Sequence, residues 1–159
     1  MPILNQFNIV AKDFDKTVEF YRRVGVNVPD GVNLPNGTRH TSVTLPNGMV
    51  FEVDNPALAQ IYNAGWQRPE GSSPVVIGFT FPTREAVDQC YGELVEAGYE
   101  SRQPPFDAFW GARYAIVADP NGNDVGLMSP IDEKRRTRPP IEPPPPQSLS
   151  TNYKPLPNL

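Results

Sequence analysis

Two segments decide the fold of this chain because they share one pattern: LPNGMVFEV at residues 45–53 and DPNGNDVGLM at residues 119–128. Each contains Pro-Asn-Gly, which is typical of a tight turn, followed by a short apolar run that is typical of a strand. Four positions after the turn glycine, the first segment has Glu52 and the second has Gly126. This pattern predicts a duplicated module in which only the first copy carries a carboxylate at this position of the strand.

The residues before the first turn begin the module. Residues 6–11 start as an alternation of polar and apolar side chains, as in a half-buried strand. Asp13 is a helix N-cap, residues 14–24 have helical spacing of apolar side chains, and Gly25 lies where a helix ends. Two more strands are expected at residues 39–44 and 49–53.

The second half of the chain repeats this order. Residues 75–81 predict a strand, Thr83 caps a helix that runs to about residue 97, and Gly98 follows it. Two late strands are expected at residues 113–118 and 124–128. Each half therefore predicts a β-α-β-β-β module, and two such modules must combine because one four-stranded sheet alone leaves a face bare. The predicted fold class is α+β.

Length, charge and cysteine content restrict the class of protein. A chain of 159 residues with 38% hydrophobic residues is long enough for one domain with a core. No apolar run is long enough for a membrane span, and the first residues do not resemble a signal peptide, so we expect a cytoplasmic protein. The net charge of −4 argues against nucleic acid as a partner. Cys90 is the only cysteine, which excludes an intramolecular disulfide.

Prolines concentrate at the C-terminus. Nine of the 20 prolines lie between residues 130 and 159, in a segment with little apolar periodicity. We therefore place the boundary near Pro130, with a domain at residues 1–130 and a proline-rich tail at residues 131–159. The tail is expected either as a solvated arm or as an arm docked on its own domain or on a second subunit.

Two longer segments carry a family resemblance: NIVAKDFDKTVEFYRRVGV at residues 8–26 and WGARYAIVADPNGNDVGLM at residues 110–128. They resemble the opening and closing parts of modules in the vicinal oxygen chelate superfamily, which includes glyoxalase I, extradiol dioxygenases and bleomycin-resistance proteins. The resemblance implies two βαβββ modules, at about residues 3–56 and 75–129. Their curled mixed sheets would form a cup with helices outside and a ligand site inside. It also implies a homodimer.

In metalloenzymes of that superfamily, four side chains of the cup bind a divalent metal. The resemblance places these positions on Gln6, Glu52, Val76 and Gly126. Only Glu52 is of a ligand type, because valine and glycine side chains donate nothing and an amide is a poor ligand. The single histidine, His40, matches none of the positions, and its spacing suggests no partner. We therefore expect no metal ligands and no cofactor.

Strand alternation predicts which side chains face the cup. In the first strand Gln6 and Asn8 would face inward, and the glycines Gly78 and Gly126 would widen the cup unless they are structural. Trp110 and Arg113 lie near the expected mouth, although packing of the ring and solvation of the arginine are the alternatives. The predicted ligand-binding residues are Gln6, Asn8, Glu52, Val76, Gly78, Trp110, Arg113, Gly126 and Met128.

Three functions are compatible with this sequence. The preferred prediction is a metal-free protein that sequesters a small organic ligand in the cup, similar to the drug-binding members of the superfamily that confer antibiotic resistance. The main alternative is a lyase, isomerase or dioxygenase-type enzyme, with Glu52 as catalytic base or metal ligand. A third is a regulatory or scaffold subunit that binds a partner through its proline-rich tail.

Overall fold

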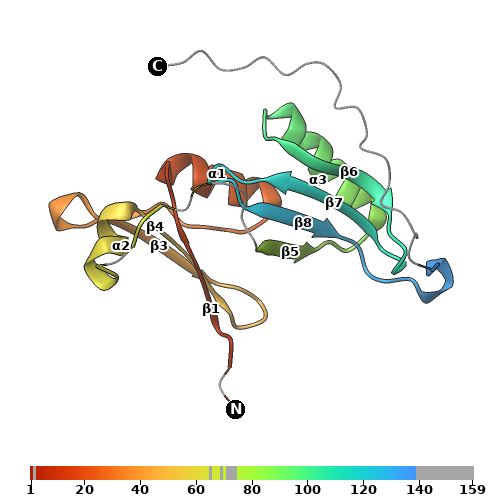
Figure 1. The fold of residues 1–159 in the computed structure, drawn as a ribbon, viewed down its shortest axis with the longest axis horizontal. Coiled ribbons are helices and arrows are strands. Elements are labelled where there is room, and N and C mark those ends of the chain that lie inside the picture. Colours follow the sequence, from red (N-terminus) through yellow and green to blue (C-terminus); the bar gives the residue numbers. More distant parts are fainter. Residues whose placement is uncertain (2, 65, 69, 71–74, 139–159) are drawn as a thin grey trace.

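A computed structural model describes residues 1, 3–64, 66–68, 70 and 75–138 (Figure 1). The two halves of the chain lie side by side along the long axis of the molecule, each with its own sheet and helix. Most of the proline-rich tail, residues 139–159, lies outside the described residues, so neither the solvated nor the docked arrangement is tested. None of the described helices has the length and apolar character needed to cross a bilayer.

The first module contains one four-stranded sheet, called sheet A. Its strand order is β1-β4-β3-β2, with β1 and β4 parallel and the other pairs antiparallel. Its elements are β1 (Gln6–Val10), α1 (Phe14–Val24), β2 (Val32–Asn33), a 3-10 turn (Pro35–Gly37), β3 (Arg39–Thr44), β4 (Val50–Asp54) and α2 (Pro56–Tyr62).

The second module contains sheet B and repeats this topology. The strand order is β5-β8-β7-β6, again with the first and last strands of the module parallel. The elements are β5 (Val76–Thr80), α3 (Arg84–Glu96), β6 (Ser101–Asp107), β7 (Arg113–Ala118), β8 (Asp124–Met128) and a 3-10 turn (Glu133–Arg135). The prediction of an α+β fold with two βαβββ modules is confirmed.

The helix ends lie where the sequence predicts them. The Asp13 side chain accepts a hydrogen bond from the Lys16 amide at 3.1 Å, and the Thr83 hydroxyl accepts one from the Ala86 amide at 3.1 Å. Both satisfy N–H groups that a helix leaves unpaired in its first turn. Gly25 ends α1 with φ at 110°, a left-handed conformation that a side chain would disfavour.

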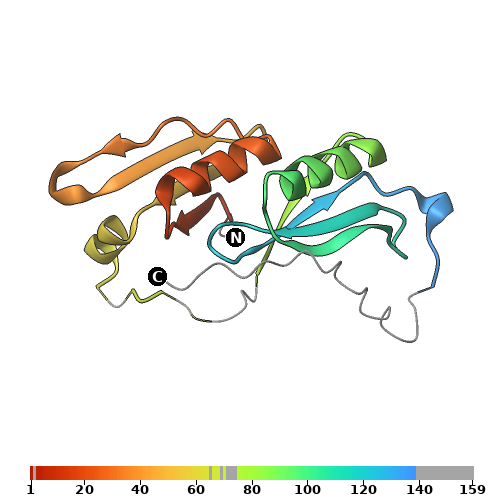
Figure 2. The ribbon, with the colours of Figure 1, turned by 90° about the horizontal axis from the view of Figure 1, so that it is seen from above.

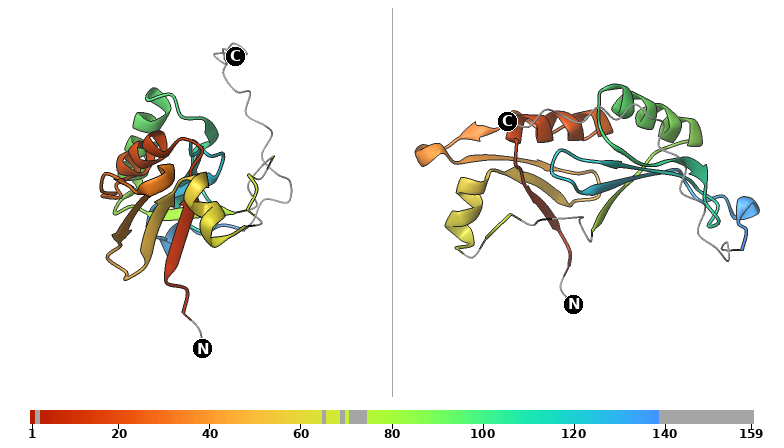
Figure 3. Two further views of the ribbon diagram at one scale, coloured as in Figure 1. Left: turned by 90° about the vertical axis from the view of Figure 1, so that its left-hand side faces the viewer. Right: turned by 45° about the horizontal axis from the view of Figure 1, so that its top comes forward.

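The hydrophobic core lies between the helices and the sheets. Figure 2 shows α1 and α3 next to each other at the centre of the molecule, and Figure 3 shows both on one side of the two sheets. Fully buried side chains from both modules meet there, among them Tyr21, Phe51, Leu94, Val117 and Leu127. The two modules therefore share one core.

Hydrogen bonds across the module boundary involve the second Pro-Asn-Gly turn. The buried Tyr21 hydroxyl on α1 donates to Asp119 at 2.8 Å. Asn121 accepts from the Lys12 amide at 2.7 Å, and its own amide donates to the Thr17 hydroxyl at 3.1 Å. The turn between β7 and β8 thus binds the N-terminal part of α1 in the other module.

Some elements differ from the sequence prediction. The helix α2 was not predicted, although Asn55 caps it by accepting from the Leu58 amide and Pro56 stands at its first position. The chain also stays in contact with the second module just after the boundary placed near Pro130. The Thr137 amide donates to the Phe109 carbonyl at 2.9 Å, which holds this part of the chain on the second module.

Candidate functional site

A cluster of polar side chains lies on the face of sheet A that points away from α1. The other face carries Phe51 and Val53, which are buried against the helix layer. Because side chains alternate along a strand, the residues between them point to the opposite face. We call this group the polar cluster; it consists of Gln6, Asn8, His40, Glu52, Asp54 and Tyr62.

Asp54 is the centre of the polar cluster. Its side chain is only 3% exposed, and its two oxygens accept three strong hydrogen bonds from three different elements. His40 Nδ1 on β3 lies 2.7 Å from Oδ1, while Asn8 on β1 and the Tyr62 hydroxyl on α2 donate to Oδ2 at 2.7 and 3.1 Å. A buried carboxylate needs such partners, because leaving it unpaired would cost several kcal/mol.

The Tyr62 hydroxyl remains a donor over the physiological pH range. Although Tyr62 as a whole is 56% exposed, loss of water around its hydroxyl, followed by the hydrogen bond to Asp54 and the Asp54 charge, raises the pKa of Tyr62 to about 12. Tyr62 is the last residue of α2, so this helix supplies one of the three donors to Asp54. The helix α2, which was not predicted from the sequence, is therefore part of the site.

Glu52 and Asn8 offer acceptor atoms on the same face. Gln6 donates its side-chain amide to Glu52, and Glu52 lies beside Asn8 in the β1–β4 register. Asn8 Oδ1 is buried and accepts no hydrogen bond from any described residue. A buried acceptor without a donor is rare in folded proteins and is consistent with a donor supplied from outside the chain.

The corresponding face of sheet B is mostly apolar and aromatic, with Thr80 and Asp124 as polar positions. On β5, Val76 is 50% exposed, and the space beside Gly78 is open. We call four rings near the β6–β7 connection the aromatic cluster: Phe106, Phe109, Trp110 and Tyr114, whose neighbouring ring centroids lie 5.0 to 6.2 Å apart. Met128 pairs with Tyr114 in the β7–β8 register.

Gly126 does not widen the cup, contrary to one reading of the sequence. A Cβ atom built at Gly126 would lie 2.6 Å from the Tyr114 hydroxyl oxygen and 3.1 Å from two ring carbons. The Tyr114 ring therefore occupies the space that the missing side chain leaves. Glycine at this position has a structural reason, which is the close approach of a neighbouring strand's side chain.

Arg113 lies on the opposite face of sheet B from Tyr114. Its guanidinium donates to Asp88 on α3 at 2.7 Å and to Asp107 at 3.0 Å. The hydrogen bond to Asp88 is the main cause of a raised pKa for Arg113. The guanidinium of Arg113 is thus paired with two carboxylates of its own module, and Arg113 does not belong to the candidate site.

The structure brings the predicted residues together in two separate groups. Gln6, Asn8 and Glu52 meet on sheet A, while the others predicted to face the cup lie on sheet B: Val76, Gly78, Trp110, Gly126 and Met128. No hydrogen bond or ring contact between described residues joins the polar cluster to the aromatic cluster. The strands β1 and β5 each pair along one edge only within the described sheets.

The donor set does not fit the metal site that the resemblance implies. Sheet A offers Glu52 and the amide of Gln6, and sheet B offers only Val76 and Gly126 at the implied positions. Among the described residues, no three His, Cys, Asp or Glu side chains are grouped in a way that could hold a metal ion. We therefore derive no chemistry through a metal.

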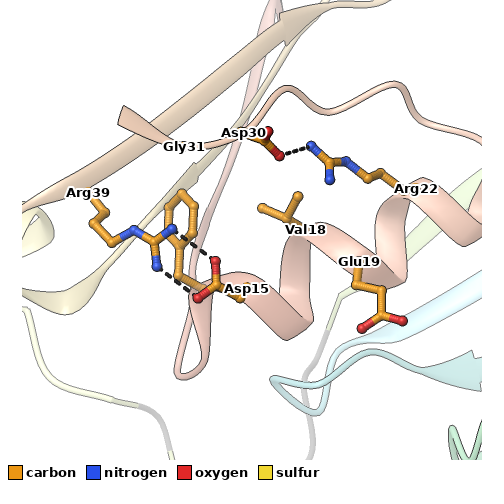
Figure 4. Close-up of a pocket in the computed structure, with 8 residues that line it drawn as sticks. Asp15, Val18, Glu19, Arg22, Asp30, Gly31 and Arg39 are labelled. Atoms are coloured by element: carbon orange, nitrogen blue, oxygen red, sulfur yellow. Dashed lines mark hydrogen bonds and ion pairs between the residues drawn. The ribbon is translucent and has the colours of Figure 1, made fainter. Parts of the chain in front are cut away.

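Two hollows lie outside the polar cluster. A cleft of about 1090 Å³ runs between the β3–β4 turn and β5 and has a mostly apolar lining, to which Val76 and Gly78 contribute. A smaller hollow of about 300 Å³ lies beside α1 (Figure 4). Four of its charged groups pair with one another, because Arg39 binds Asp15 at 2.9 and 3.0 Å and Arg22 binds Asp30 at 2.8 Å.

The partner of His40 was not predicted from the sequence. Asp54 lies directly opposite His40 in the antiparallel β3–β4 register. The Pro-Asn-Gly turn before β4 contained the necessary signal. Placing residues 44 and 50 on either side of the turn also pairs residues 42 and 52, and then 40 and 54.

Comparisons with known proteins agree with this architecture. The family model described as Glyoxalase/Bleomycin resistance protein/Dioxygenase superfamily matches residues 3–127. No curated protein sequence matches the chain. A glyoxalase-related enzyme from Fulvimarina pelagi has a similar structure, with a TM-score of 0.66 at 17% identity, covering 82% of this chain and 89% of that one.

Two further solved structures have the same fold. A glyoxalase/bleomycin resistance protein/dioxygenase from Nocardioides has a TM-score of 0.63 at 20% identity, covering 83% of this chain and 85% of that one. A family enzyme from Burkholderia phytofirmans PsJN has a TM-score of 0.63 at 18% identity, covering 79% of this chain and 97% of that one. With the family model matching most of its length, the chain belongs to the glyoxalase/bleomycin resistance protein/dioxygenase superfamily.

Proposed function

We propose that this protein binds a small organic cation without a metal, in a site made of the polar cluster and the aromatic cluster. The observation that carries the proposal is the acidic character of the polar cluster. Two carboxylates, Glu52 and Asp54, lie beside the unpaired acceptor Asn8 Oδ1. The strands of sheet A place no lysine or arginine on this face.

These groups favour a ligand with a positive charge and N–H donors. A hydrogen bond between an ammonium group and Glu52 would be charge-assisted, which makes it about twice as strong as a neutral one. The same ligand could donate to Asn8 Oδ1 and so satisfy that buried acceptor. Aromatic rings attract cations through their negative faces, so the aromatic cluster suits the same class of ligand.

We further propose that a second copy of the chain completes the site. The polar and aromatic clusters lie on different sheets, and each sheet has an open edge, at β1 and at β5. Exposed apolar side chains lie at both edges: Ile3 and Leu4 before β1, and Val76 on β5. A homodimer that placed sheet B of one copy beside sheet A of the other would cover these side chains and bring the two clusters together.

Ligand binding is tested with ethidium, a planar aromatic cation, followed by its own fluorescence at low salt. Glu52→Gln should weaken ethidium binding by roughly 10-fold or more, because a hydrogen bond to a charged group contributes about 1.5–3 kcal/mol. Trp110→Phe should weaken it less, since the ring face remains. The matched control is Glu96→Gln on the exposed outer side of α3, which should bind like wild type.

Three results would contradict the proposed binding. The first is unchanged ethidium affinity in Glu52→Gln. The second is equally tight binding of the anion 1-anilinonaphthalene-8-sulfonate, because an acidic site should disfavour it. The third is loss of ethidium binding after treatment with EDTA, which would indicate a metal-dependent site.

The homodimer is tested by complementation between two defective variants. Glu52→Gln and Trp110→Ala chains are co-expressed with different affinity tags, and the mixed dimer is isolated. If the site forms between two copies, one of the two sites in the mixed dimer has both residues intact and should bind ethidium with wild-type affinity. If each chain forms its own site, no site is intact and the affinity stays low.

A further inference from the structure

His40 has the surroundings of an oriented imidazole base. It is the only histidine in the chain, and it lies on β3 beside Asp54 on β4. The distance of 2.7 Å between Nδ1 and Asp54 Oδ1 is that of a strong hydrogen bond. The imidazole is 35% exposed, so it is anchored at one nitrogen while the ring remains accessible.

The hydrogen bond to Asp54 determines which nitrogen of His40 carries the proton. A carboxylate only accepts hydrogen bonds, so Nδ1 must be the donor. In the neutral ring the lone pair is then on Nε2, which has no hydrogen-bond partner among the described residues. This is the arrangement in which a histidine acts as a general base while a carboxylate fixes its tautomer and stabilises the imidazolium.

Asp54 is itself held in place by groups from two other elements. Asn8 on β1 and Tyr62 on α2 both donate to its second oxygen. Loss of water around its hydroxyl and the neighbouring Asp54 carboxylate raise the pKa of Tyr62 to about 12, so Tyr62 stays a donor to Asp54. The charged or titratable groups facing the His40–Asp54 pair are thus Tyr62 and, farther along β4, Glu52.

Glu52 is less suited than His40 to remove a proton. Gln6 donates to one oxygen of Glu52, whereas Nε2 of His40 has no hydrogen-bond partner among the described residues. The two acidic residues therefore have different roles in this arrangement. Glu52 attracts the ligand, and Asp54 orients the histidine.

We infer that the site also transfers protons, with His40 Nε2 as the general base toward a bound small molecule that has an acidic C–H bond, and with Asp54 as the positioning residue. This inference rests on the proposed function in one respect, which is that a ligand binds at the polar cluster. It goes beyond it by assigning an activity to a residue that lies outside the four metal-ligand positions of the related enzymes.

The activity is tested with 5-nitrobenzisoxazole, a neutral carbon acid that reports on general bases. His40 Nε2 takes the proton from C3, the C–H electron pair forms the third bond of a nitrile, and the N–O bond breaks. The product is 2-cyano-4-nitrophenolate, which is coloured, and the imidazolium then returns its proton to water. The reaction needs no oxidant, reductant or other reactant.

Removal of the base should abolish most of the reaction. We expect His40→Gln to lower the protein-dependent kcat/KM by about 10-fold or more, since a positioned general base contributes roughly 10²–10⁴-fold. Added imidazole should restore the rate in His40→Ala but not in Asp54→Asn, in which His40 is present in the wrong orientation. Asp54→Asn should also change the pH dependence of kcat/KM. Glu96→Gln on α3 is again the control.

The single histidine allows a second test on the unaltered protein. Diethylpyrocarbonate can modify only one imidazole in this chain, and the modification is visible at 240 nm. Elimination activity should fall in step with this signal and return with hydroxylamine. This measurement does not depend on the stability of any variant.

Several outcomes would overturn the inference. They are absence of protein-dependent elimination in wild type, an unchanged rate in His40→Gln or after modification, and a rate that depends on Glu52 but not on His40. Ethidium binding that depends on Glu52, together with elimination that does not depend on His40, would refute the base and leave the binding proposal standing. The reverse pattern would refute the binding proposal alone.

Discussion

The hydrogen bond between Tyr21 and Asp119 gives a quantitative test of how strongly the two modules are coupled. Tyr21→Phe keeps the buried ring and removes only the hydroxyl that donates to Asp119 at 2.8 Å. A hydrogen bond to a charged group contributes about 1.5–3 kcal/mol, so we expect a loss of about 2 kcal/mol in the free energy of unfolding. With a urea m-value of about 2 kcal/mol/M, the unfolding midpoint should fall by roughly 1 M.

A neutral pair within one module provides the control for Tyr21→Phe. The Tyr91 hydroxyl and the Ser101 hydroxyl lie 2.6 Å apart, and both belong to the second module. Tyr91→Phe should cost about 1 kcal/mol or less, because neither partner is charged. A Tyr21→Phe midpoint within about 0.2 M of wild type would refute the reasoning, as would two separate unfolding transitions in wild type.

The same tyrosine predicts a pH dependence. Burial, followed by the charge and hydrogen bond of Asp119, raises the pKa of Tyr21 well above its ordinary value of 10.0. Above pH 10 the unfolded chain therefore loses this proton while the folded chain keeps it, so folding is disfavoured as the pH rises. The stability difference between wild type and Tyr21→Phe should be full below pH 10 and should shrink above it. A constant difference up to pH 11 would contradict this assignment.

Two further substitutions test the assignments made on sheet B. Gly126→Ala should either displace the Tyr114 ring or lower the free energy of unfolding by about 1–3 kcal/mol through overpacking. A displaced ring would change the near-UV circular dichroism spectrum, and a loss of stability would lower the urea midpoint. If neither changes, the Tyr114 ring does not fill this space. Arg113→Met should leave ethidium affinity unchanged, because Arg113 lies outside the candidate site. It should lower the free energy of unfolding by less than about 1 kcal/mol, because the ion pairs of Arg113 with Asp88 and Asp107 are partly exposed. A 10-fold loss of ethidium affinity would show that Arg113 belongs to the site.

Local signals predicted the fold well. The caps at Asp13 and Thr83 and the glycine after α1 are short-range features with their own physical cause, so the helix boundaries could be read directly. The strand β6 was not located because it contains Pro104 and Pro105, which normally argue against a strand. It tolerates them as an edge strand with two register shifts against β7.

The site was harder to predict because it depends on pairing between elements. The alternation of side chains along a strand is enough to place Asn8 and Glu52 on the face of sheet A that points away from the helix. The contact between His40 and Asp54 needs the hairpin register, and the contact with Tyr62 needs α2 to be recognised and placed. The Arg113 side chain points toward α3, where it pairs with Asp88, and no spacing in the sequence indicates this ion pair.

The contact between Asn121 and the start of α1 also constrains how the chain folds as it is synthesised. The Lys12 amide is separated by 109 residues from the side chain that accepts its hydrogen bond, and Tyr21 by 98 residues from Asp119. While the ribosome has made only the first module, α1 lacks these partners. The Tyr21 hydroxyl then has no Asp119 to accept its hydrogen bond. The first module can therefore reach its final packing only after almost the whole domain has emerged, which makes folding of this duplicated protein a late, long-range event.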